Sequence, residues 1–232
     1  MFNVETALTT ISANDTPDLT NVTQMNRMFE DASAFNGDIS DWDVSGVVNM
    51  KRMFDGASAF NQDLPNWDVG NVTNMRTMFA DATAFNGDIS AWDVSSVTDM
   101  GAMFFRAENF NQDIRLWKVG NVTDMARMFE GATAFNPPAL AWNVTNVTNM
   151  RSMFEDAENY NGRMGGWNVS SVGNMRNMFA GASNFNRIIK SWDVSSVTNM
   201  RAMFFEAETY NQPLGDWGMD VSNVTDMSSM FE

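Results

Sequence analysis

The chain has 232 residues and a net charge of −15, from 29 acidic and 14 basic residues, and it contains neither histidine nor cysteine. Such an acidic chain lacks the clustered Lys and Arg that a nucleic-acid partner requires. Without His and Cys there can be no disulfides, thiolate or imidazole metal sites, or Ser-His and Cys-His nucleophile pairs. Carboxylate chemistry and an oxygen-ligated cation such as calcium remain open.

Residues 1–18 do not follow the pattern of the remaining chain, and we expect an N-terminal flank or a partial capping unit there. The first residues lack the basic and apolar regions of a secretion signal. No apolar run approaches the ~20 residues of a membrane helix, so we expect no membrane insertion by this segment.

Residues 19–232 form a repeat with a period of 25 residues, marked by Trp42, Trp67, Trp92, Trp117, Trp142, Trp167, Trp192 and Trp217. A constant period of this length indicates a stack of repeating units that bury their apolar surfaces against each other. The sequence stops within a ninth unit, so we expect that the natural array continues or that a cap follows.

The first half of each unit predicts a helix. In the unit NVTNMRTMFADATAFNGDISAWDVS, the first residue, Asn71, is of a type favoured at helix N-caps. Apolar residues then follow at spacings of three and four, which places them on one helix face. We therefore expect about three turns of helix from Val72 to Ala82.

The second half of the unit predicts a strand. Trp92, Asp93 and Val94 alternate between apolar and polar, and Ile89 and Val97 complete the spacing L-x-x-L-x-L. Successive copies can pair as parallel strands ~4.8 Å apart. The predicted fold is an α/β solenoid, similar to leucine-rich repeats, of about eight 25-residue coils. It has a parallel short-stranded sheet on one face and short helices on the other.

One asparagine recurs between the two halves of every unit, directly after an aromatic residue. An amide at this corner can bond to backbone groups of adjacent turns. We therefore predict a structural ladder at Asn36, Asn61, Asn86, Asn111, Asn136, Asn161, Asn186 and Asn211.

The residue between the strand Trp and Val points outward and forms the candidate binding face: Asp43, Asp68, Asp93, Lys118, Asn143, Asn168, Asp193 and, after a two-residue insertion, Asp220. Stacked carboxylates about 5 Å apart repel by ~1 kcal/mol in water. Either a cation or a basic partner neutralises them, or each Asp makes a local backbone hydrogen bond at a turn. The exchange of Asp with Asn favours the second interpretation.

A threonine column comprises Thr23, Thr73, Thr98, Thr123, Thr148, Thr198 and Thr225. Regular threonines suggest ice binding, but bonds to first-turn amides of the predicted helices explain them more simply. The Asn-Val-Thr and Asn-Val-Ser triplets are formal glycosylation sequences that the repeat itself produces.

The motif V-T-x-M-x-x-M-F-x-x-A-x-x-F-N-x-x-I-x-x-W-x-V-S resembles the 25- to 26-residue repeat of bacterial surface proteins and lipoproteins of mycoplasma, Listeria and lactobacilli. It also looks like the BspA-type leucine-rich repeat, with Met and Trp in the place of Leu. The resemblance implies an extracellular or cell-surface location and a role in adhesion or host contact.

The leading hypothesis is a non-enzymatic, surface-displayed repeat protein that binds a protein or glycan through the sheet face. A purely structural stalk or spacer is the alternative. A carboxylate glycosidase needs a distinct pair of acids, and the acids here recur with the repeat instead. We expect no cofactor, with calcium at the Asp column as the one open exception.

Overall fold

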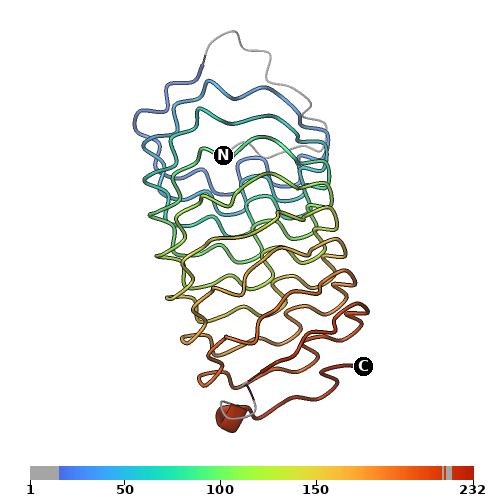
Figure 1. Ribbon diagram of the computed structural model, residues 1–232. Helices are drawn as coiled ribbons and strands as arrows, with labels where there is room; N and C mark the ends of the chain where they lie inside the picture. Colours follow the sequence, from blue (N-terminus) through green and yellow to red (C-terminus); the bar gives the residue numbers. More distant parts are fainter. Residues whose placement is uncertain (1–15, 216, 218–220) are drawn as a thin grey trace.

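The computed structural model describes residues 16–215, 217 and 221–232. The chain winds through flattened coils that stack along one axis in the order of the sequence (Figure 1). Coils 1 to 7 begin at residues 21, 46, 71, 96, 121, 146 and 171, and coil 8 begins at 196. Backbone hydrogen bonds join each coil to the next at offsets of 23 to 27 residues.

The predicted helices and sheet are absent from the described residues. Helical conformation there is limited to the 3-10 helix η1, Val221–Asn223, and to the single residue Trp217. In the part of the chain that the structure describes, strand-like pairing is limited to isolated parallel bridges. They run in one column from Gln24 through Asn74 to Asp226, with one more between Ala139 and Arg163. The prediction of an α/β solenoid, with Trp-x-Val strands and Met-x-x-Met-Phe helices, is therefore wrong.

Consecutive turns replace the predicted helix. In coil 3, backbone N–H groups of Met78, Ala80 and Ala82 each donate to the carbonyl three residues earlier. The intervening N–H groups instead donate to coil 4; those of Thr77 and Phe79, for example, bond to carbonyls there at 2.9 Å. We call residues 75–82 and their equivalents the turn segment.

The spacing of the coils explains why a helix does not form. Parallel pairing sets neighbouring backbones ~4.8 Å apart, whereas an α-helix with its side chains is about 10 Å wide. A close, nearly straight stack therefore has no room for one helix per coil. The turn segment meets this limit with left-handed residues, at φ values of 53° for Thr77 and 52° for Asp81. Such conformations cost roughly 1–2 kcal/mol each, which the bonds to the next coil offset.

Three columns of aromatic rings fill the core. Phe79 stacks on Phe104 of the next coil with ring centroids 5.7 Å apart, and Phe85 stacks on Phe110 at 6.0 Å. The indoles form the third column, which includes a stacked pair at 6.3 Å between coils 3 and 4. Phe79 also lies 6.2 Å from the Trp92 ring, across the coil. The turn segment and the part of the coil that carries the Trp residue thus pack on two sides of one apolar interior.

Candidate functional site

The predicted binding column lies on the Trp face, which we define as the exposed surface of residues 38–45 and their equivalents in coils 2 to 7. Each Asp or Asn of the column accepts a hydrogen bond through Oδ1 from the backbone N–H two residues later. The bond from Ser45 to Asp43 measures 3.0 Å, for example. The other members with this bond are Asp68, Asp93, Asn143, Asn168 and Asp193. Asp220 lies outside the described residues.

These local bonds favour the ionised carboxylates. The hydroxyl and backbone N–H of Ser45 lower the pKa of Asp43, and Ser195 lowers the pKa of Asp193 in the same way. Ser95 lowers the pKa of Asp93, with a smaller contribution from Lys118 in the next coil. Each Asp is thus held by its own turn, and the geometry of the column requires no cation.

Calcium at this column stays a prediction. Among residues 16–215, 217 and 221–232, no three acidic side chains converge as metal ligands do. A calcium titration of the melting temperature tests the prediction directly, because a ligand of the native state alone stabilises it.

The asparagine ladder runs along the stack as seven hydrogen bonds between coils. The backbone N–H of Asn111 donates to Oδ1 of Asn86 at 2.9 Å, and Oδ1 of Asn111 accepts from Asn136 at 2.9 Å. The remaining bonds join Asn36, Asn61, Asn161, Asn186 and Asn211 to their neighbours. Most of these asparagines are exposed, so the ladder connects coils at the surface.

The threonine column also connects coils. Thr98 Oγ1 donates to the carbonyl of Thr73 at 3.2 Å, and Thr123 Oγ1 donates to Thr98 at 3.2 Å. Asn71, expected at a helix N-cap, donates through Nδ2 to the carbonyl of Ser45 at 2.9 Å. The helix roles predicted for these residues are wrong, because their partners lie in the preceding coil.

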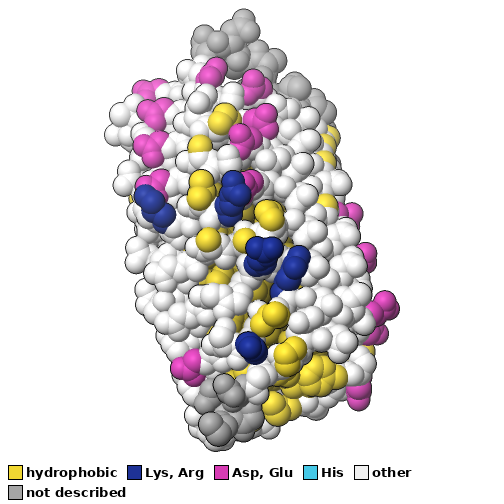
Figure 2. Space-filling view, in the orientation of Figure 1, with side chains coloured by type: hydrophobic (Ala, Val, Ile, Leu, Met, Phe, Trp, Pro, Cys, Tyr) yellow, Lys and Arg dark blue, Asp and Glu magenta, His cyan; other side chains and the backbone are white. Residues whose placement is uncertain are grey.

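A second column of the Trp face changes its charge along the stack, and sequence reasoning missed it. Its members are acidic in coils 1 to 4 and then become proline, arginine and isoleucine. They are Asp38, Asp63, Asp88, Asp113, Pro138, Arg163, Ile188 and Pro213. Arg115 and Lys118 of coil 4 and Arg187 and Lys190 of coil 7 add positive charge, so the basic half of the face comprises coils 4 to 7. In coil 4, Asp113 pairs with Arg115 at 3.1 Å. Figure 2 shows acidic side chains toward the N-terminal end and Lys and Arg farther along. Comparing every exposed repeat position between coils would have revealed the change.

The basic half of the Trp face also exposes large apolar side chains. Leu116 is 79% exposed and Ile188 is 55% exposed. The residues at the position of Leu116 in the adjacent coils are Ala91 and Ala141. The repeat therefore does not require a large apolar residue there.

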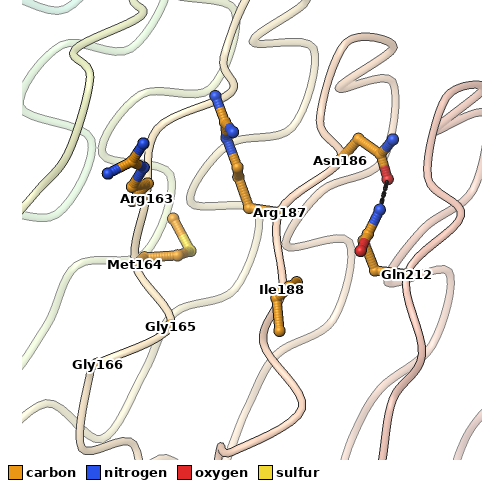
Figure 3. Close-up of a pocket in the computed structure, with 8 residues that line it drawn as sticks. All are labelled: Arg163, Met164, Gly165, Gly166, Asn186, Arg187, Ile188 and Gln212. Atoms are coloured by element: carbon orange, nitrogen blue, oxygen red, sulfur yellow. Dashed lines mark hydrogen bonds between the residues drawn. The ribbon is translucent and has the colours of Figure 1, made fainter.

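A hollow of about 560 Å³ lies on the same half, between coils 6 and 8 (Figure 3). Arg163, Arg187 and Ile188 line it, and at Gly166 an added Cβ would meet nothing within 4 Å. The Nε–H of Arg187 donates to the carbonyl of Asn161 at 2.6 Å, which fixes that side chain. Positive charge, an apolar side chain and open space are thus combined in one place.

The fold and the Trp face define a repeat protein of stacked coils, with one surface whose charge changes from acidic to basic along the stack. Comparison with protein families identifies the family of the chain. Residues 1–95, 65–166 and 138–232 each match the family described as "Mycoplasma protein of unknown function, DUF285". The chain belongs to this family, which confirms the mycoplasma part of the resemblance but does not extend to BspA-type leucine-rich repeats.

A search of the curated proteins found none that matches the chain. Within the described residues, no helix has the length and apolar character needed to cross a bilayer.

Proposed function

We propose that the protein is a non-enzymatic binding scaffold, displayed on a cell surface, that holds a protein partner on the basic half of its Trp face. The coils provide a stiff support, and the exposed positions of the repeat provide the recognition. Adhesion to another cell or to a matrix is the biological role that this arrangement suits.

The observation that carries the proposal is the exposure of Leu116 and Ile188 among basic residues. A spacer gains nothing from exposed apolar side chains, which lower solubility. Protein interfaces characteristically combine an apolar centre with arginine and a polar rim. Ile188 has Arg187 beside it in sequence and Arg163 at the equivalent position of the preceding coil, so a partner with apolar and acidic side chains fits this surface.

The acidic half gives the partner a defined orientation. Asp38, Asp63 and Asp88 occupy in coils 1 to 3 the position that Arg163 occupies in coil 6. A partner with acidic groups is attracted to one half of the face and repelled from the other. Complementary potentials of this kind fix register and increase association rates.

Two further features support a role outside catalysis. The sequence has no His or Cys, and its carboxylates recur with the repeat. The proposed surface location comes from the resemblance of the motif to the repeat of bacterial surface proteins and lipoproteins.

Photo-crosslinking tests the proposal. A photoreactive amino acid replaces Leu116 in one variant, Ile188 in a second and Asp41 in a third. Asp41 is the matched control, because it occupies the position of Leu116 in coil 1, at the acidic end of the face. Each variant is displayed to intact target cells, and crosslinked partners are identified and then purified.

We expect the same partner from positions 116 and 188 and none from position 41. The purified partner should bind Leu116→Ser about tenfold more weakly than the wild type, since a central apolar contact is worth about 1–2 kcal/mol. If no position yields a partner and the substitutions alter stability alone, the protein is a stalk.

A further inference from the structure

The arginines of the two ends of the stack have different surroundings. In coils 1 to 5 each arginine has a carboxylate oxygen within 4.0 Å: Arg27, Arg52, Arg76, Arg106, Arg115 and Arg127. In coils 6 to 8, none has such a partner among the described residues: Arg151, Arg163, Arg176, Arg187 and Arg201. The positive charge of this end is therefore available to a ligand.

Three of these arginines form one row. Arg151, Arg176 and Arg201 occupy the same position of coils 6, 7 and 8, at the start of the turn segments. The carbonyl of Arg176 accepts from the N–H of Ser152 at 2.8 Å, and that of Arg201 accepts from Asn177 at 2.9 Å. The backbones are thus in register, and like charges about 5 Å apart repel by ~0.8 kcal/mol even in water. We call these three residues the Arg row.

Arg76 occupies the same position in coil 3 and shows how the protein neutralises a charge there. Its Nη1 contacts Asp99 Oδ1 at 3.4 Å and Asp124 Oδ2 at 2.9 Å, from the next two coils. The equivalent residues for Arg151 are Asn174 and Asn199. These amides remove the neutralisation at Arg151, whereas Asp226 keeps a carboxylate at the same position in the ninth unit, beside Arg201.

The asparagines beside the row bond to the backbone of its arginines. Oδ1 of Asn174 accepts from the N–H of Arg176 at 3.1 Å, and Oδ1 of Asn199 accepts from Arg201 at 3.0 Å. Their acceptor oxygens are thus engaged by the backbone. Arg176 Nε is shielded from solvent and has no hydrogen-bond partner among the described residues. Asp226, in the ninth unit, is the nearby acid, since Arg201 and Arg176 contribute to lowering its pKa, after the larger effect of Ser228.

We propose that the Arg row binds a linear sulfated polysaccharide. Guanidinium groups bind oxyanions through paired N–H donors, and a regular row matches a polymer with regularly spaced sulfates. This site lies on the turn segments, across the apolar core from the Trp face, and is independent of the protein-binding site proposed there.

The composition of the row favours a polysaccharide over a protein or a nucleic acid. The exposed Thr148 and Thr198 and the half-buried Asn174 and Asn199 lie beside the row. Met227, which follows Asp226 and is 41% exposed, does not by itself make the apolar centre of a protein interface. Nucleic acids require more extensive positive surface, and the chain carries a net charge of −15. Three aligned arginines are sufficient for a short sulfated segment.

Fluorescence anisotropy with labelled heparin oligosaccharides, on the whole chain, tests this site. The decisive variant is Asn174→Asp with Asn199→Asp, which keeps every arginine and supplies the carboxylates that Arg76 has. We expect its affinity for heparin to fall at least tenfold, as for Arg151→Gln with Arg201→Gln. Its melting temperature should not fall, because aspartate is already present at this position in coils 4 and 5.

The matched control is Asn49→Asp with Asn74→Asp, which adds the same charge at the other end of the stack and should leave binding unchanged. Equal losses in both double variants would reduce the effect to net charge and overturn the assignment. No heparin binding by the wild type would also overturn it. Equal affinity for polyglutamate, or for a single-stranded oligonucleotide of the same charge, would reject a sulfated polysaccharide as the specific ligand.

Discussion

In coils 1 to 5 the arginines bond to carboxylates of the same molecule, whereas the arginines of coils 6 to 8 have no such partners among the described residues. Both regions bury the same columns of Met, Phe and Trp. The comparison shows that this repeat uses different positions for stability and for surface recognition. The buried columns are fixed by stacking, and the exposed columns vary from coil to coil without cost to the core.

The largest expected effect on stability concerns the core that both regions share. Phe104 and Phe179 each stack on aromatic rings of both neighbouring coils and are completely buried. Replacing either by alanine should cost about 3–5 kcal/mol of unfolding free energy, with nearly equal values in urea titrations. A much smaller loss at Phe179 would mean that the two regions do not share one core.

The asparagine ladder should have a smaller effect. Asn111→Ala removes the acceptor of Asn136 and should cost about 1 kcal/mol, more than the few tenths expected for Thr123→Ala. The reason is that Asn111 satisfies a backbone N–H, whereas Thr123 adds a second donor to a carbonyl. Equal urea midpoints for the two variants would contradict a stabilising ladder.

The ion pairs provide a direct comparison of the two regions. Arg76→Gln should lower stability by roughly 0.5 kcal/mol, a value reduced by solvent screening of this 37% exposed side chain. Arg176→Gln should leave stability unchanged or raise it, because it removes repulsion within the Arg row. The difference between the two variants should vanish in high salt, as thermal melts at two salt concentrations would show.

Two carboxyls on the turn segments give the smallest predicted effect. Burial raises the pKa of Asp81 and of Asp156; Arg106 opposes the shift at Asp81, whereas Glu155 and Glu130 add to it at Asp156. A raised pKa in the folded state means that ionisation weakens folding as the pH rises through that value. Asp156→Asn should therefore raise the melting temperature at pH 7 more than Asp81→Asn.

At pH 3 the gain from Asp156→Asn should largely disappear, since the wild-type carboxyl is then protonated. Asp43 provides a control of opposite sign. Its pKa is lowered in the folded state, so the stability that its ionised carboxylate contributes is lost as the pH falls. A gain at Asp156 that did not depend on pH would indicate a backbone effect of asparagine at φ 56°.

The sequence was sufficient to predict the stacking of 25-residue units, because Trp residues that recur at a constant spacing indicate stacked repeats. It placed the Asn residues between a helix and a strand that the described residues do not contain, although their hydrogen bonds do join adjacent coils. It was misleading on local structure: Val72, Met75 and Met78 have helical spacing, but they fill a flat coil whose alternate N–H groups bond to the next coil. Spacing within one unit cannot show that the neighbouring backbones lie too close for a helix.

The candidate sites were less predictable for a related reason. The Asp43 column is exposed, but its contacts are local turns, and its role in binding stays a prediction. The charge reversal from Asp88 to Arg163 and the loss of carboxylates at Asn174 appear only when equivalent positions are compared across coils and the structure shows which coils touch.

The measurement that tests the central claim most directly is the NMR exchange rate of the arginine Nε–H protons. The Nε–H groups of Arg52 and Arg127 donate to carboxylates at 2.7 and 2.6 Å, so they should exchange slowly with water. Those of Arg151, Arg163 and Arg201 should exchange at rates near those of a free side chain. Equally slow exchange at all five would contradict the account, because the arginines of coils 6 to 8 would then be engaged within the molecule and unavailable to partners.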